Sequence, residues 1–365
     1  MRVTVPKEKI LNAALIAERV IGKKETLPVL SCILIDVGKD VSLRATNLEA
    51  GVDIHMGADV DEKGVVAVPA SILTQTLRSV SGDKVTLKVD GANLHIQARG
   101  SKTLIKAVPH DEFPALAGKE GGKGLRLQRE LLLQALQAVV YAASTSMIRP
   151  ELGSVYVKVD DSKLTAVATD SFRLAEKTIS DASGGGSADV LIPLKHAQEI
   201  LHILERISSE DVEIIVDDAQ LTLKSDNLRF VSRVIDGTFP NYHEIMPKNF
   251  STEATLLKSD FAEALRKARV FAGADQHVGF HVYPKKKVFD ITAQSAAIGE
   301  MSDSLEAAVT GDDIDVNFHI GYVADCLQSI PSDSLILGFS GAGKPLVVRG
   351  VSDATFTYLV MPLNR

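Results

Sequence analysis

The chain has 365 residues, of which 45% are hydrophobic and 24% charged, a composition typical of a soluble globular protein with buried cores. No run of 18 apolar residues occurs and the N-terminus lacks an apolar signal stretch, so we expect neither a membrane span nor secretion. The only cysteines, Cys32 and Cys326, lie far apart, which argues against a disulfide framework and a cysteine metal site and favours a cytoplasmic location.

The first third of the chain reads as helix, strands, helix and strands. Apolar residues at helical spacing predict an amphipathic helix over 7–20. Short strands are expected at 32–37, 41–46 and 52–56, and Pro69 stands where a first-turn proline opens a helix over 70–80. Alternating residues on either side of 90–93 predict a hairpin whose turn contains Gly91.

The same order of elements returns twice. The pattern predicts helices over 129–141, 193–207, 259–271 (with Ser259 as its N-cap) and 322–329, and strands at 155–159, 164–169, 212–216, 221–225 and 355–360. Thr46 matches Thr169 after 123 residues, Pro69 matches Pro193 after 124, and Phe113 matches Phe239 after 126. This period is the size of a whole domain.

Two breaks divide the repeats. A glycine-rich stretch over 118–124 reads as a linker, and 248–252 is a weaker boundary. We therefore predict three domains, at 1–118, 125–248 and 250–365, each of the α+β class with two helices packed on antiparallel sheets.

Few side chains suggest catalysis or metal binding. Gly341 to Lys344 resembles a phosphate loop, but Pro345 and a β-rich run follow it, which favours a turn between strands. The nine histidines show no zinc spacing and are expected at the surface. An enzyme using Asp170, or His277 with His281, is the alternative, although a carboxylate after a strand more often closes its own turn. We expect no cofactor and no metal.

The charges are unevenly distributed. Counted with their flanking residues, over 7–24, 69–80, 129–141, 193–207, 258–270 and 317–330, the six predicted helices carry a net charge of +5, which leaves −12 on the rest of a chain whose total is −7. One interpretation is that helices simply favour lysine and arginine. The other is that the helices face a polyanion while the sheets face solvent, with few phosphates neutralised and therefore no tight grip on DNA.

The C-terminus keeps apolar residues, Met361, Pro362 and Leu363, close to the free end, where chains are usually polar. This pattern predicts either a capped last strand or the lining of a groove for a partner peptide.

Five segments together resemble the bacterial β sliding clamp family, the processivity subunit of DNA polymerase III. They are 27–30, 168–175, 236–242, 245–247 and 360–363, and they occur in the family's order over the full length. The resemblance implies a non-catalytic, head-to-tail homodimer whose six similar domains close into a ring. Helices would line a hole that holds double-stranded DNA without sequence preference, and sheets would form the outside.

The resemblance also implies three sets of functional residues. A groove between the second and third domains would bind short linear peptides of the replicative DNA polymerase and the clamp loader; its residues would be Leu152, Thr169, Ser171, Phe172, Arg173, Leu174, Pro240, Ile245, Leu359, Met361, Pro362 and Leu363. DNA contacts are expected at Lys24, Arg78, Arg149, Lys195, Arg266 and Lys267. The dimer interface, between the first and third domains, is expected at Leu104, Ile105 and Phe271.

The chain departs from the family pattern at its predicted groove. Ser171-Phe172 stands where the family usually has Gly-His, and Glu244 stands where it often has arginine. A basic residue usual in the family is missing around 276–279. These departures are consistent with a divergent clamp, or a second clamp, that has altered partners.

Overall fold

The computed structural model describes residues 1–22, 27–116, 124–146, 148–160, 162–180, 188–217 and 219–363. Contacts divide the chain into two compact units. Unit 1 comprises Met1–Leu133 and Ala182–Val234, and unit 2 comprises Gln134–Asp181 and Ile235–Arg365. The three domain boundaries expected from the sequence remain a prediction.

Unit 1 begins with the whole first repeat. Its helices are α1 (Lys7–Val20), η1 (Pro28–Ser31) and α2 (Ala70–Ser79), and its strands are β1 (Arg2–Pro6), β2 (Cys32–Val37), β3 (Val41–Thr46), β4 (Ala50–Met56), β5 (Asp59–Glu62), β6 (Gly64–Pro69), β7 (Lys84–Asp90), β8 (Asn93–Ala98) and β9 (Ser101–Lys106). From the second repeat it contains β10 (Leu125–Gln128), β14 (Ala188–Pro193), α4 (Leu194–Arg206), β15 (Asp211–Val216), β16 (Gln220–Lys224) and β17 (Leu228–Arg233). Helix α3 (Arg129–Val139) begins in unit 1 and ends in unit 2.

Two antiparallel sheets organise unit 1. A five-stranded sheet runs in the order β5-β1-β7-β8-β9, and an eight-stranded sheet runs β10-β15-β16-β17-β4-β3-β2-β6. In the second sheet β17 pairs with β4, so strands of the second repeat continue the sheet of the first. Helix α1 packs on α2, β3 and β4. Its stripe of apolar residues is buried there, with Ile10, Ala14 and Ala17 at 0% exposure.

Unit 2 holds the rest of the second repeat and the third. Its helices are η2 (Val140–Ala142), η3 (Tyr242–Glu244), α5 (Lys258–Phe271), η4 (Pro284–Lys286), α6 (Ile320–Asp325) and η5 (Cys326–Ser329). Its strands are β11 (Ser154–Asp160), β12 (Lys163–Thr169), β13 (Arg173–Ile179), β18 (Thr252–Leu257), β19 (His277–Tyr283), β20 (Val288–Ser295), β21 (Gly299–Ser304), β22 (Ala307–Gly311), β23 (Ile314–His319), β24 (Ser334–Phe339), β25 (Leu346–Gly350) and β26 (Asp353–Val360).

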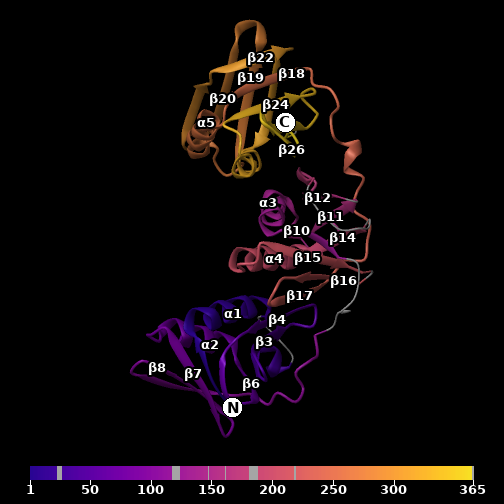
Figure 1. Cartoon of the computed structure of the whole chain (residues 1–365). Coiled ribbons are helices and arrows are strands. Elements are labelled where there is room, and N and C mark those ends of the chain that lie inside the picture. Colours follow the sequence, from indigo (N-terminus) through magenta and orange to yellow (C-terminus); the bar gives the residue numbers. More distant parts are fainter. Residues whose placement is uncertain are drawn as a thin grey trace. The chain divides into compact units, whose positions relative to one another are not determined.

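The sheets of unit 2 repeat the plan of unit 1. A four-stranded sheet runs β21-β20-β19-β23, and a larger sheet contains the run β11-β12-β13-β26-β25-β24-β18-β22. Here β13 pairs with β26, so the last strand of the third repeat continues the sheet of the second. Helix α5 packs on β20 and β21 (Figure 1).

Most predicted elements are found within two residues of their expected ends, but the helix expected over 322–329 is α6, which ends at Asp325 and continues as η5. The N-cap of α5 is Leu257, and Ser259 lies inside the first turn with its hydroxyl bonded to Asp260, so the predicted serine cap is wrong. The helix expected from Tyr322 begins at Ile320, where the His319 side chain caps it. Gly341 to Lys344 forms the predicted turn, closed by a 3.0 Å backbone bond. No helix in the described ranges is long and apolar enough to span a membrane.

A cluster of four aromatic rings forms the core under the four-stranded sheet. Phe280 lies 5.7 Å from Phe261, 5.6 Å from Phe289 and 5.3 Å from Phe318, measured between ring centroids. All four side chains have 0% exposure. This cluster fixes α5 against the sheet whose open edge is β21.

We predict that Phe280→Ala lowers the free energy of unfolding by about 3–5 kcal/mol, because it leaves a cavity at the centre of this cluster. Thermal and denaturant unfolding should reveal the loss. The control is Val270→Ala on α5, the helix that also carries Phe261. The Val270 side chain is 62% exposed, so its loss should change stability by less than about 0.5 kcal/mol. Equal effects of the two changes would contradict the prediction.

Candidate functional site

The candidate groove is built on the turn that joins β12 to β13. Thr169 Oγ1 donates a 2.6 Å hydrogen bond to the Arg173 carbonyl and accepts one of 3.2 Å from the Ser171 N–H. Asp170 Oδ1 accepts from the N–H groups of Phe172 and Arg173, so Asp170 closes its own turn. Ser171 has φ 78°, in the left-handed region that non-glycine residues rarely adopt. The turn leaves Phe172 58% exposed.

Arg173 is fixed by two carboxylates and two rings. Its Nε donates to Asp170 Oδ2 at 3.0 Å, and its Nη1 donates to Asp325 Oδ2. The guanidinium carbon lies 4.6 Å from the ring centroid of Tyr322 and 5.8 Å from that of Tyr141. Because Tyr322 and Asp325 belong to α6, these contacts attach the turn to that helix.

The floor of the candidate groove is a pair of buried leucines. Leu174 on β13 lies directly opposite Leu359 on β26, and their side chains are 1% and 2% exposed. Leu152 and Thr169 are also buried. A ligand at the surface would therefore touch these four residues only where the side chains above them move aside.

The C-terminal tail runs beside the turn. The Met361 N–H donates to the Phe172 carbonyl at 2.8 Å, and the Leu363 N–H donates to the Asn317 carbonyl at 2.8 Å. Met361 is 36% exposed, while Pro362 and Leu363 are half-buried. The tail is thus both anchored like a capped strand and apolar at the surface, as a groove wall would be.

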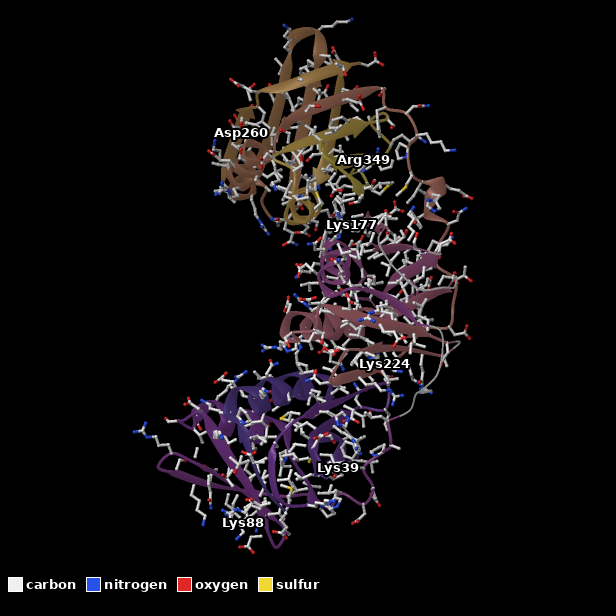
Figure 2. The ribbon with its side chains drawn as sticks, viewed as in Figure 1. Lys39, Lys88, Lys177, Lys224, Asp260 and Arg349 are labelled. Carbon is white, nitrogen blue, oxygen red and sulfur yellow. The ribbon has the colours of Figure 1, made fainter. Side chains whose placement is uncertain are left out.

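The segment 239–245 is attached to β13. The Tyr242 hydroxyl donates to Glu176 Oε2 at 2.6 Å, and burial together with this bond raises the pKa of Tyr242 above its ordinary value. Pro240 is half-buried, and Ile245 is 51% exposed. Glu244 is exposed at this rim. On the same strand Lys177, labelled in Figure 2, donates to Asp353 Oδ2 at 3.0 Å.

Sequence reasoning missed the aromatic pair of Tyr322 and His319, of which Tyr322 lies beside Phe172. The Tyr322 ring lies 6.3 Å from Phe172 and 4.3 Å from His319. His319 Nδ1 accepts from the Tyr322 N–H, and partial burial, followed by the charge of Arg173, lowers the pKa of His319. A signal was present, because Phe318-His319 stands where Pro69 and Pro193 open helices in the other repeats.

The predicted DNA-contact residues differ in whether their positive charges already form ion pairs within the chain. Lys24 lies outside the described residues. Lys267 bonds Glu263 at 3.0 Å and Asp303 at 3.1 Å, and these two bonds raise its pKa, so its charge is already matched. Arg149 pairs with Glu151 at 3.0 Å. The remaining candidates are exposed: Arg78, Lys195 and Arg266.

Helices α1 and α4 also neutralise part of their positive charge. Arg19 on α1 pairs with Glu199 on α4 at 3.0 Å, and Glu199 is only 6% exposed. Arg206 Nε donates to His202 Nε2 at 2.9 Å. Burial, followed by the charges of Arg19 and Arg206, lowers the pKa of His202 to about 4.

The predicted interface residues lie at two sheet edges. Leu104 is 52% exposed on β9, whereas Ile105 is buried at 3% exposure and faces the core. Phe271, at the end of α5, is half-buried, and its Cε1 would lie 3.8 Å from a Cβ built on Gly299 of β21. Each of β9 and β21 ends its sheet.

The histidines are only partly at the surface. His196 is 3% exposed with Nδ1 2.8 Å from Ser232 Oγ, so the expectation of a surface position is wrong for it. His281 Nδ1 lies 2.5 Å from Asp315 Oδ1, and its Nε2 lies 2.9 Å from Thr292 Oγ1. Within the described ranges, no group of three His, Cys, Asp or Glu side chains could hold a metal ion.

Models of one family match nearly the whole chain. The N-terminal, central and C-terminal domains of the DNA polymerase III beta subunit match residues 1–117, 126–241 and 243–364. The beta sliding clamp of Bacillus subtilis is 26% identical, with 100% of both chains covered. That of a Synechocystis species is 25% identical over 100% of this chain and 99% of the relative.

Solved structures share the fold. The crystal structure of the DNA polymerase III beta subunit from Thermotoga maritima matches with a TM-score of 0.95 at 24% identity, covering 100% of this chain and 99% of that one. The DNA polymerase sliding clamp from Bacillus subtilis matches with a TM-score of 0.93 at 23% identity and the same coverage.

We predict that NMR titration finds a His202 pKa near 4 and that Arg206→Gln raises it, because a positive charge and a donated hydrogen bond are removed. The pKa should still stay below the ordinary value of about 6.5, since burial is the largest cause of the shift. The control is Lys88→Gln, which removes an exposed charge from β7 and should leave the His202 titration unchanged. An unchanged His202 titration in Arg206→Gln would refute the assigned cause.

Proposed function

The chain belongs to the DNA polymerase III beta subunit family, the beta sliding clamps, and from this premise we propose how it works. Two copies close head to tail into a ring around duplex DNA. Each copy then holds partner proteins through the groove beside Phe172. The observation that carries the proposal is that three family domains match in order along one chain.

A sliding clamp is a processivity subunit and not a catalyst, so the alternative of an enzyme on a repeated scaffold is wrong. The side chains that suggested it have other roles. Asp170 bonds its own turn and Arg173. His281 on β19 lies between Asp315 and Thr292, which belong to the two strands that flank β19, β23 and β20.

The proposed ligands of the groove are short linear peptides of the replicative DNA polymerase and the clamp loader. Phe172, Met361 and Ile245 supply exposed apolar surface, while Arg173 and Asp170 keep the turn rigid between them. Such a surface suits leucine or phenylalanine anchors, which bind best where the receptor is already ordered. Phe172 in place of histidine favours peptides with a larger apolar contact at this wall.

We predict that Met361→Ala weakens peptide binding about tenfold, equivalent to about 1.4 kcal/mol, because it removes an exposed anchor contact. Fluorescence anisotropy with a labelled hexapeptide that carries one leucine and one phenylalanine measures the change. Leu174→Ala, in the floor, should weaken binding as well. Val351→Ala is the matched control, 52% exposed in a turn of the same sheet, and should bind as the wild type does. Unchanged affinity in both groove variants would refute the groove assignment.

The ring closure is argued from two strand pairings inside the chain. In unit 1, Val231 of β17 lies opposite Gly51 of β4. In unit 2, Leu359 of β26 lies opposite Leu174 of β13. The registers within the repeats match Val231 to Leu359 and Gly51 to Leu174, so both pairings have the same register.

Strands β9 and β21, which each end a sheet, occupy the positions that β17 and β4 have in the other repeats. The registers match Leu104 of β9 to Val231, and Glu300 of β21 to Gly51. We therefore infer that β9 of one copy pairs with β21 of a second copy, with Leu104 opposite Glu300. In this register Ile105 comes opposite Gly299 of the second copy. Because Phe271 packs over Gly299, Ile105 would then lie beside that ring. The register therefore supports the proposal that Leu104, Ile105 and Phe271 all lie at the interface. A head-to-tail contact of this kind closes when the rotation per chain completes a circle.

We predict that a variant carrying Thr103→Cys and Met301→Cys forms a covalent dimer on oxidation, because the register places these residues directly opposite each other. Non-reducing electrophoresis and light scattering measure the product. Leu104→Cys with Met301→Cys is the control, since a shift of one residue points the side chains to opposite faces. A strict monomer at micromolar concentration, or preferential crosslinking of the control, would contradict the ring.

The proposed DNA contacts are the exposed residues Arg78, Arg149, Lys195 and Arg266, together with Lys24, which lies outside the described residues, and a weaker contribution from Lys267. Partial pairing of the basic side chains fits a clamp that holds DNA by enclosure, because few counterions are released and sliding stays easy. We propose a cytoplasmic location, where both buried cysteines would stay reduced. The domains proposed are 1–118, 125–248 and 250–365.

A further inference from the structure

Unit 1 contains a second copy of the groove turn. Between β3 and β4, Thr46 Oγ1 donates to the Ala50 carbonyl at 2.9 Å and accepts from the Leu48 N–H at 3.1 Å. Asn47 Oδ1 accepts from the N–H groups of Glu49 and Ala50 at 3.0 and 2.7 Å. Leu48 has φ 73°, close to the 78° of Ser171 at the equivalent place. Bond for bond, this is the turn that carries Phe172.

The strand that follows is also placed in the same way. The Arg233 N–H donates to the Glu49 carbonyl at 2.8 Å, as the Met361 N–H donates to the Phe172 carbonyl. Glu49 and Arg233 therefore stand where the open groove has Phe172 and Met361. The position of the floor residue Leu174 is taken by Gly51.

The missing leucine of the floor is replaced by Leu116, which comes just before the predicted linker over 118–124. A Cβ built on Gly51 would lie 2.2 Å from Leu116 Cδ2 and 3.5 Å from Leu116 Cγ, so the Leu116 side chain occupies the space above the glycine. Pro114, Ala115 and Leu116 line the remaining cavity of about 150 Å³ together with the turn and Arg233. Leu116 is half-buried there.

We infer that this junction is a second copy of the peptide groove, which the chain closes by inserting its own Leu116 as a built-in ligand. The inference rests on the proposed peptide groove for the meaning of an open site. Leucine is the anchor chemistry that the open groove suits, and the missing Cβ of Gly51 leaves room for it. Each chain therefore offers one open groove, although its fold builds two.

The first test counts peptides per chain, with the same labelled hexapeptide and isothermal titration. The wild type should bind one peptide per chain, and Leu116→Ala should bind two, because the plug is removed. Leu48→Ala is the control, 58% exposed on the same turn, and should still bind one. One peptide per chain for a folded Leu116→Ala would overturn the inference.

The second test asks whether Leu116 sits on Gly51 in solution and needs no peptide. Gly51→Leu introduces the side chain found at Leu174, which should expel Leu116 and raise hydrogen exchange at the Ala115 and Leu116 amides at least tenfold. Unchanged exchange in this variant would overturn the inference, whether or not Leu116→Ala folds. If the wild type binds no peptide while Gly51→Leu releases Leu116, the peptide groove itself fails and the plug remains.

Discussion

Backbone pairing between the last strand of one repeat and the fourth strand of the repeat before it is the constraint on which the structure depends. β17 joins β4 in unit 1, and β26 joins β13 in unit 2, in one common register. Each pairing satisfies the donors and acceptors of two strands that would otherwise be open edges. It also fixes the turn that precedes the paired strand, because a residue at the end of the partner strand donates to that turn: Arg233, the last residue of β17, to Glu49, and Met361, the first residue after β26, to Phe172.

The same turn serves different purposes because only its side chains change. In both copies a threonine hydroxyl and an Asx carbonyl or carboxylate oxygen satisfy the backbone, so the conformation does not depend on what the exposed residues are. Phe172 and Arg173 make one copy an apolar surface with a rigid base. Glu49, Ala50 and Gly51 make the other a socket for Leu116. The two repeats thus share one turn conformation, and the differing side chains on it give each turn its own binding properties.

The periodic and local features could be predicted from the sequence. The helix over 7–20 and the strands at 32–37 and 41–46 are found with the expected ends, because apolar spacing alone determines them. Asp170 was read correctly as a turn residue for the same local reason.

Long-range pairs could not be predicted. The contact of Arg173 with Asp325 spans 152 positions, and nothing near Asp325 in sequence marks it as a partner. Ile105 is buried at 3% exposure, because alternation along β9 sends Leu104 outward, so its predicted place at an interface depends on a second copy that extends this core. His196 appeared to be a surface residue until the fold placed Ser232 beside it. Such features depend on which strands meet, and a single sequence does not record that directly.

The open edge β9 carries a consequence for partner choice. Lys102 and Lys106 flank Leu104 on its exposed face, so two β9 strands brought together would set like charges against each other. Glu300 on β21 would instead lie diagonally between the two lysines. Two β9 edges would thus repel each other, whereas β9 and β21 would attract each other. This charge pattern favours head-to-tail association of identical chains before any apolar contact forms.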